Sequence, residues 1–209
     1  MLKQHPIFLH LTAWVSLFCL FVLFYCLFGL STRAHANSEQ ITLKQECTAN
    51  IQNIYSAKGS AHSPESIPQQ GWQKLKQLPD RWHDRWPNYH GNAWYKIEWN
   101  YHCPNPTAVT PISLSIESIT QTGQVFINNN LLWRDIATTE PISRNQVKPH
   151  LWNIPVANLH QGQNIIWIQV QGNQIQKSGI GHVALGNYAQ MYKLYNSWLL
   201  EKQTLPYFN

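Results

Sequence analysis

The alternation of apolar and polar side chains is clearest over residues 93–101. Positions 93, 95, 97, 99 and 101 are all apolar or aromatic, whereas positions 96, 98 and 100 are polar. This pattern predicts a strand with one buried face and one solvent-facing side. The preceding residues, 71–90, place aromatic side chains among Pro, Asp, Arg and Asn without a period, which predicts a structured loop. The whole block, 71–101, holds five of the ten tryptophans: Trp72, Trp82, Trp86, Trp94 and Trp99.

Further short strands follow at regular spacing. Alternation predicts strands over 112–117 and 165–171, with shorter ones over 151–154 and 181–186. Residues 125–133 read as a hairpin around three asparagines, which tolerate the left-handed backbone of such a turn. Many short strands indicate a mainly β chain, an antiparallel β-sandwich or jelly roll.

The segments that flank these strands differ from this pattern. Residues 41–55 fit a strand or a short helix equally well, and residues 56–70 lack a large apolar cluster and predict an exposed loop. Apolar side chains recur at helical spacing over 189–202, which predicts an amphipathic helix that Pro206 would stop.

The N-terminus predicts export. Residues 11–30 are almost entirely apolar, and Ala34-His35-Ala36 is a small-x-small signal peptidase pattern, with Asn37 as the first mature residue. The apolar run, at about 20 residues, also has the length of a membrane span, so an uncleaved anchor is the alternative. Both interpretations place the remaining chain outside the cytoplasm.

The exported part carries two cysteines, Cys47 and Cys103. An even count in an oxidising compartment favours one disulfide, and two buried unpaired thiols are the alternative. The leader's Cys19 and Cys26 carry no redox information. Only 12% of all residues are charged and Lys and Arg form no run, so the net charge of +5 does not indicate nucleic-acid binding. The mature length, about 170 residues, suits one domain.

Three motifs resemble a known family. The chain resembles the galactose-binding-like jelly roll found at the N-terminus of family 2 glycoside hydrolases and in many bacterial receptors. The resemblance covers residues 71–186. It rests on Trp72, Leu78-Pro79-Asp80, Trp82, Gly91 and Ala93-Trp94-Tyr95-Lys96, on the hairpin strand at 124–129, with Asn129 in place of the usual glycine, and on the strand start at 159–166.

A narrower resemblance is to the extracytoplasmic sensor regions of bacterial membrane histidine kinases and diguanylate cyclases. It rests on residues 132–135, 179–186 and 195–205. It implies a non-catalytic periplasmic ligand-sensing domain associated with the inner membrane. The expected divisions are 1–36 (signal peptide or anchor), 37–70 (extension and loop), 71–187 (β-sandwich) and 188–209 (helix leading toward a membrane segment).

The given sequence stops at Asn209, where such receptors continue into their first membrane helix. A piece of a longer receptor and a stand-alone secreted carbohydrate-binding module are both compatible with this. In the first case any kinase or cyclase activity would lie beyond residue 209. A third possibility is a structural domain that contacts a protein partner or forms a homodimer.

Sites for catalysis or metal binding are not predicted. The ten histidines form no HxH, HExxH or Cys/His cluster, and the nearest approach to one, His83-Asp84 with Asp80 and His90, reads as exposed loop residues. Glycoside hydrolysis needs two carboxylates at a set separation. Two of Glu98, Glu117 and Asp135 could be imagined as such a pair, but Glu98 and Glu117 fall on polar strand faces, where solvated carboxylates are the default. The resembling hydrolases keep their carboxylates in another domain. We therefore expect no metal and no cofactor.

Ligand binding is the expected function. Sugars present C–H faces that pack on aromatic rings, while charged and amide side chains hold their hydroxyls. Trp72, Trp82, Trp94 and Tyr95 match core positions of the family and are expected to be structural. The remaining candidates lie at an exposed loop tip, beside a hairpin, or in the loop before residue 151: Asp84, Arg85, Trp86, Tyr89 and His90; Trp133 and Arg134; and Arg144.

Overall fold

The computed structural model describes residue 24 and residues 46–60, 66–104, 111–120, 122–135, 148–172 and 178–204. The predicted leader, with its cleavage site between Ala36 and Asn37, lies outside these residues, except for Phe24. The chain divides into two compact units, Met1–Lys44 and Gln45–Asn209, and all the described strands lie in the second unit. Within the described part of the chain, no helix has the length and apolar character needed to cross a membrane.

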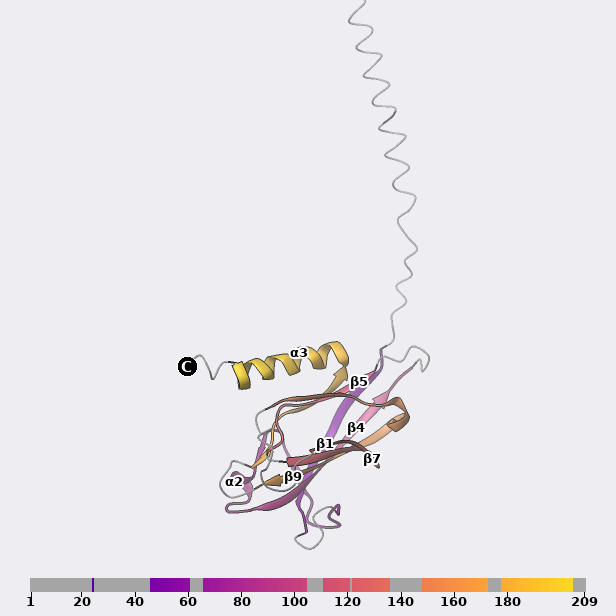
Figure 1. Ribbon diagram of the computed structural model, residues 1–209. Helices are drawn as coiled ribbons and strands as arrows, with labels where there is room; N and C mark the ends of the chain where they lie inside the picture. Colours follow the sequence, from indigo (N-terminus) through magenta and orange to yellow (C-terminus); the bar gives the residue numbers. More distant parts are fainter. Residues whose placement is uncertain are drawn as a thin grey trace, which may run out of the picture. The chain divides into compact units, whose positions relative to one another are not determined.

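A six-stranded antiparallel sheet forms the larger layer of this unit (Figure 1). The hairpin strands and the strand at 93–101 are confirmed, and all neighbouring pairs run antiparallel. The strand order in this sheet is β2 (Gln73–Leu75), β1 (Thr48–Lys58), β4 (Gly91–His102), β9 (Gly162–Gly172), β6 (Thr122–Ile127) and β7 (Asn130–Arg134).

A three-stranded sheet and a helix complete the fold. The sheet runs β11 (Val183–Asn187), β5 (Ile112–Ile116), β8 (His150–Asn153). Helix α3 (Tyr188–Leu199) contacts all three strands and continues into a π-helical turn, η3 (Leu200–Thr204). Small elements lie at one end: β3 (Asp80–Arg81), which pairs with β10 (Gly179–Ile180), and the four-residue helix α2 (Trp82–Arg85). A 3-10 turn, η2, spans Val156–Asn158.

The core lies between the two sheets. On β4 the side chains of Tyr95, Ile97 and Trp99 are fully buried, as the alternation predicts. They belong to one apolar cluster with Ile112 and Leu114 of β5, so two antiparallel sheets share a single interior. All five residues of β5 are buried. This strand is covered on both sides because α3 packs over the face opposite the core.

The structure corrects several sequence expectations. The ambiguous segment before residue 55 is a strand, and β1 continues through residues expected to be loop, because Ala57 and Lys58 still pair with Trp94 and Ala93. Side-chain spacing did not reveal this pairing. The loop at 71–90 contains β2, β3 and α2. Helix α3 begins one residue earlier than expected, where the side chain of Asn187 accepts a hydrogen bond from the Gln190 amide.

The predicted disulfide between Cys47 and Cys103 is present. It joins the residue before β1 to the residue after β4, next to the paired residues Thr48 and His102. The two cysteines are 56 positions apart. A cross-link of such a loop stabilises a fold by about 2–4 kcal/mol, mainly through restriction of the unfolded chain.

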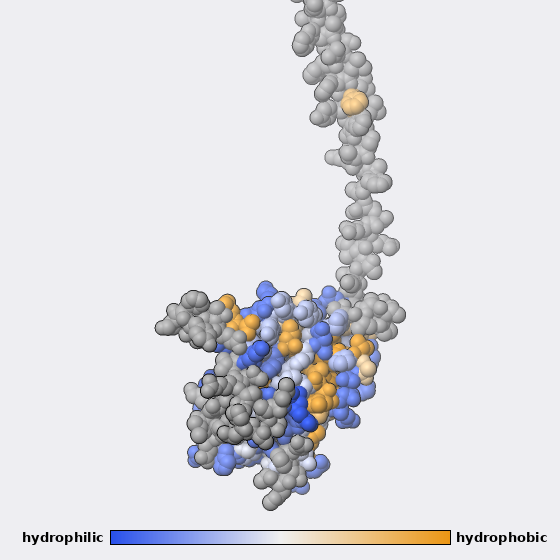
Figure 2. All heavy atoms as spheres, viewed as in Figure 1, coloured by the Kyte–Doolittle hydropathy of each residue, from blue (hydrophilic) through white to orange (hydrophobic). Residues whose placement is uncertain are grey.

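Apolar side chains are exposed in places. The face shown in Figure 2 mixes apolar and polar areas, with apolar atoms both beside the C-terminal end of α3 and over the middle of the folded unit. The most exposed apolar residues of α3 and η3 are Tyr188, Tyr192 and Leu200, and the first two rings stack at 5.7 Å.

One aromatic cluster joins an edge of the large sheet to an edge of the small one. Trp133 of β7 lies 4.8 Å from the His150 ring and 5.5 Å from the Trp152 ring of β8. His150 stacks on Trp152 at 5.0 Å. Burial lowers the pKa of His150 to about 4; the Asp135 charge opposes this shift and the Lys148 charge adds to it. His150 is therefore neutral at physiological pH and packs as an aromatic ring.

The sandwich should lose stability as His150 becomes protonated. The folded-state pKa lies below the ordinary value of 6.5, so the unfolded chain takes up the proton first as the pH falls. Neutral His150 contributes fully to the free energy of unfolding above about pH 6.5, and this contribution declines as the pH falls toward 4. Its complete loss lowers the free energy of unfolding by about 2–3 kcal/mol. Urea denaturation of the wild type and of His150→Phe from pH 4 to 7.5 measures it. Equal pH dependence of the two proteins would contradict the assignment.

Candidate functional site

One member of the loop tip that was expected to contact ligand, Trp86, is folded into the core. Trp86 is only 8% exposed, and its ring packs on Trp82 and Tyr89 at 6.1 and 5.4 Å. The expected exposure of Trp86 is therefore wrong. The reason is α2: its single turn places residues 82 and 86 on one side, as i,i+4 spacing does in any helix. That spacing was visible in the sequence, but the surrounding polar residues obscured it.

The other tip residues divide between the surface and the interior. Asp84 and His90 are exposed, and Asp84 contacts His83 at 2.7 Å. Tyr89 is half-buried, its hydroxyl donates to the Asn92 carbonyl, and desolvation raises its pKa. The ammonium of Lys58 lies 4.7 Å from the Tyr89 ring centre. These contacts hold the tip against the end of β1 and β4, and ligand binding by its exposed members stays a prediction.

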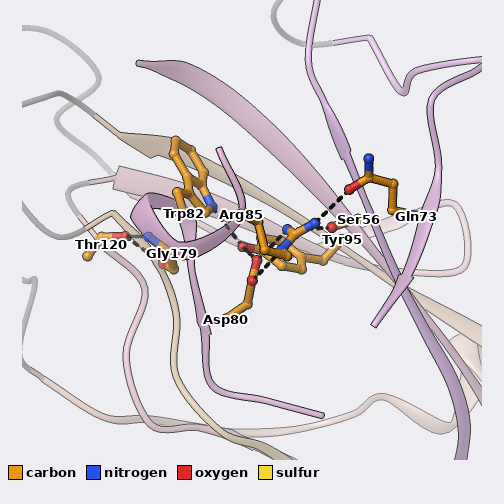
Figure 3. A network of polar contacts seen from close by, with 8 residues as sticks. All are labelled: Ser56, Gln73, Asp80, Trp82, Arg85, Tyr95, Thr120 and Gly179. Atoms are coloured by element: carbon orange, nitrogen blue, oxygen red, sulfur yellow. Dashed lines mark hydrogen bonds and ion pairs between the residues drawn. The ribbon is translucent and has the colours of Figure 1, made fainter. Parts of the chain in front are cut away.

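Arg85 is a structural residue at the centre of a polar network (Figure 3). Its Nε and Nη2 donate to the two carboxylate oxygens of Asp80, both at 2.7 Å. Nη2 also donates to Ser56 Oγ at 2.8 Å, and Nη1 donates to Gln73 Oε1 at 3.0 Å. Such a bidentate geometry is the strongest form of Arg–carboxylate pairing.

Tyr95 completes the network from the core side. Its hydroxyl donates to Asp80 Oδ2 at 2.7 Å and accepts from Trp82 Nε1 at 2.8 Å. Burial, and then the Asp80 charge, raise the pKa of Tyr95 well above its ordinary range. The hydroxyl therefore stays protonated and remains a donor to the carboxylate. Gly179 lies against this site with φ +148°, where a Cβ would overlap the Asp80 carbonyl oxygen.

The hairpin candidates lie apart from the loop tip. Trp133 belongs to the aromatic cluster with His150 and Trp152 described above. Arg134 is exposed, and its Nε donates to Gln124 Oε1 at 2.8 Å across the β6–β7 pair. Arg144 lies outside the described residues. No contact between the tip and the hairpin brings the predicted residues of the described segments into one site.

A different set of residues forms a groove on the outer face of the large sheet. The groove has a volume of about 530 Å³, within the range of roughly 300–1,000 Å³ typical of small-molecule sites. Strands β1, β4 and β9 supply its floor and residues 67–72 supply its wall. The lining residues are Tyr55, Ile67, Pro68, Gln69, Trp72, Lys96, Glu98 and Trp167.

Strand register brings the floor together. Tyr55 pairs with Lys96, and Lys96 pairs with Trp167, so the three side chains stand in one row on the outer face. Trp72 comes over this row from the chain before β2, and its ring lies 5.7 Å from that of Trp167. Its indole Nε1 donates to the Pro68 carbonyl at 3.0 Å, which fixes the ring relative to the wall.

An ion pair lies on the floor between the rings. Lys96 Nζ is 2.6 Å from Glu98 Oε1, and Asn53 Nδ2 donates to Glu98 Oε2 at 3.1 Å. The hydrogen bond from Lys96 and that from Asn53 lower the pKa of Glu98 and outweigh the effect of burial. The carboxylate is thus ionised, and the floor presents a donor and an acceptor side by side.

Sequence reasoning placed these residues only in part. Trp82, Trp94 and Tyr95 are buried as expected, but Trp72 is half-buried at the groove, so its assignment to the core is wrong. Trp167 was not among the predicted ligand-binding residues. Its outward direction could have been predicted, because Ile166 and Ile168 face the core and side chains alternate along a strand. Its grouping with Tyr55 and Trp72 arises only across the sheet.

Comparison with known proteins gives a partial likeness of fold. No protein-family model and no curated protein matches the sequence. A family 2 glycosyl hydrolase from Bacteroides cellulosilyticus DSM 14838 is similar with a TM-score of 0.45 and 13% identity over 66% of this chain and 21% of that one. A β-glucuronidase from an uncultured Clostridium sp. gives a TM-score of 0.41 and 12% identity over 65% and 23%.

A third similar structure is the β-glucuronidase of Bifidobacterium dentium in complex with coumarin-3-O-glucuronide, with a TM-score of 0.41 and 13% identity over 66% and 21% of the two chains. The chain spans about a fifth of the length of these enzymes. At such TM-scores the likeness says nothing about activity or ligand in this protein.

The Asp80 network should be essential for stability. Asp80→Ala removes the acceptor of Arg85 and Tyr95 while both remain partly or fully buried, and breaking a buried pair on one side costs about 3–5 kcal/mol. Asp84→Ala, four residues along and 60% exposed, is the matched control, with an expected change below about 0.5 kcal/mol. Chemical denaturation measures both. Equal losses in the two variants would contradict the role assigned to the network.

Proposed function

We propose that this protein is an exported, non-catalytic β-sandwich that binds carbohydrate in the groove on the outer face of its large sheet. The observation that carries the proposal is the grouping of Tyr55, Trp72 and Trp167 around the Lys96–Glu98 pair. Aromatic faces pack against the C–H faces of a sugar ring. Adjacent charged groups then orient its hydroxyls, as polar groups do in other small-molecule sites.

The groove chemistry favours binding over catalysis. Among the described lining residues Glu98 is the one carboxylate, whereas glycoside hydrolysis uses two, one of them a general acid. A general acid needs a raised pKa, and hydrogen bonding lowers that of Glu98. The described residues also contain no group of three or more His, Cys, Asp or Glu arranged to hold a metal ion.

We further propose that binding serves ligand sensing in the periplasm, beside the inner membrane. The sequence resemblance to sensor regions supports this finer function, and the disulfide suits an oxidising compartment. Helix α3 supplies a mechanical connection, because Lys202 of η3 pairs with Glu117 at 2.7 Å at the end of β5. Through this contact a shift in the sandwich would be passed toward residue 209, where a kinase or cyclase domain would follow.

Loss of a groove tryptophan should weaken sugar binding without unfolding the protein. Trp167→Ala and Trp72→Ala are each expected to weaken binding by about ten-fold, because the truncation removes apolar area buried against the sugar as well as a ring contact, which between aromatic rings is worth about 0.5–1.5 kcal/mol beyond that area. A glycan array identifies the ligand and calorimetry measures the affinity. Tyr192→Ala, an exposed aromatic on α3, is the matched control. Absence of binding to any glycan would overturn the proposal.

The gene tests the sensing role separately. If the chain belongs to a receptor, the reading frame past codon 209 should encode membrane helices followed by a kinase or cyclase domain. A stop codon at that point would favour a stand-alone secreted carbohydrate-binding module. Neither result bears on carbohydrate binding, which the tryptophan variants test, because all the residues that line the groove belong to the described part of the chain.

A further inference from the structure

The position of Lys96 restricts the charge of a ligand in the groove. Its ammonium lies 5.7 Å from the Tyr55 ring centre and 5.9 Å from the Trp167 ring centre. A cation within about 6 Å of an aromatic face is attracted to the ring. The Lys96 ammonium therefore occupies the space between these two rings. A group of aromatic rings without such a lysine would instead suit a quaternary ammonium ligand.

The ion pair also leaves hydrogen-bonding capacity toward the groove. An ammonium has three donors and a carboxylate about four lone-pair sites. The contact between Lys96 and Glu98 uses one of each, and Asn53 takes one further site on the carboxylate. The side chains of Lys96 and Glu98 are 28% and 14% exposed. A donor and an acceptor of opposite charge thus remain side by side at the groove floor.

We propose that the Lys96–Glu98 pair makes the groove selective for uncharged sugar rings, with two neighbouring hydroxyls bridging the ammonium and the carboxylate. This inference rests on the carbohydrate-binding function proposed above. One hydroxyl accepts from Lys96 Nζ, and the next donates to Glu98 while the ring stacks on the tryptophans. An amino sugar would bring its cation against Lys96, and a uronic acid would bring its carboxylate against Glu98. Like charges placed together in this way oppose binding.

The probes are sugars that differ in charge and a simple cation. Neutral oligosaccharides (cello-, manno-, xylo- and galacto-), chitosan oligosaccharides and oligogalacturonate are titrated into the full chain, with tryptophan fluorescence as the readout. Tetramethylammonium is titrated in parallel. The wild type should bind at least one neutral series, with charged sugars at least ten-fold weaker and no saturable response to tetramethylammonium.

Lys96→Met tests the pair directly, because it keeps the length of the side chain and removes the charge. The variant should bind the neutral sugar at least ten-fold more weakly and should gain saturable tetramethylammonium binding in the vacated space between the rings. Glu98→Gln should also weaken neutral-sugar binding. It should reduce the difference in affinity between the neutral sugar and oligogalacturonate, because the repulsion of the uronate carboxylate by Glu98 is removed. Lys76→Met, an exposed lysine outside the groove lining, is the control and should change affinity less than two-fold.

The outcomes separate this inference from the proposed function. Sugar binding that depends on Trp167 but not on Lys96, or a wild-type preference for a charged sugar, would overturn the charge selectivity and leave carbohydrate binding in place. Binding of tetramethylammonium by the wild type as strongly as by Lys96→Met would also overturn it. Absence of any sugar binding would overturn both. Thermal unfolding of each variant checks that the sandwich is intact, and Lys96→Gln serves as a second variant if Lys96→Met is unfolded.

Discussion

The bidentate ion pair between Asp80 and Arg85 connects parts of the chain that the strand ladders alone do not join. Through Ser56 it reaches β1, through Gln73 it reaches the edge strand β2, and through Tyr95 it reaches the middle of β4. Strand β2 has only three residues and pairs with β1 alone. The hydrogen bond from Arg85 to Gln73 gives this edge strand, which Trp72 directly precedes, a further contact with the sandwich. The groove on the outer face depends in this way on a polar network on the inner side.

The two faces of β4 explain why the core and the candidate site do not interfere with each other. Tyr95, Ile97 and Trp99 face inward and pack against the small sheet, while Lys96 and Glu98 face outward. Trp94 is an exception, since it lies on the outward side yet is 1% exposed and stacks with Phe126 of β6. Its indole nitrogen is buried without a hydrogen-bond partner among the described residues. The outward side of this sheet thus has an apolar part beside the groove.

The sequence predicted the sandwich well where the chain has a simple period. The alternation in residues 93–101 and 165–171 and the asparagine turn at Asn128, which has φ +54°, all appear in the structure. It failed where the determining contact is distant in sequence. Residues 56–58 look like loop, but all three pair with β4 and Ser56 also pairs with β2, which makes them a strand. Trp86 looks exposed among polar neighbours, and only the turn of α2 directs it inward.

The candidate site was missed for a related reason. Its floor comes from three strands that are far apart along the chain, and each contributes an unremarkable residue of a polar face: Tyr55, Lys96 and Trp167. Local patterns identify which face a residue takes but not which residues become neighbours across a sheet. Clustering of aromatic residues in the sequence pointed instead to 82–90, where the rings pack against one another.

The row across β1, β4 and β9 has a consequence for when the groove exists. Side chains alternate between faces with a period of two, so a slip of β9 by one residue would send Trp167 into the core and Ile166 or Ile168 out to solvent. The groove is therefore present only after the two long-range strand pairings have formed in the native register. Pairings of this kind form slowly because they close long loops. Ligand binding would accordingly report the completed sheet, and a bound ligand would hold its register by mass action.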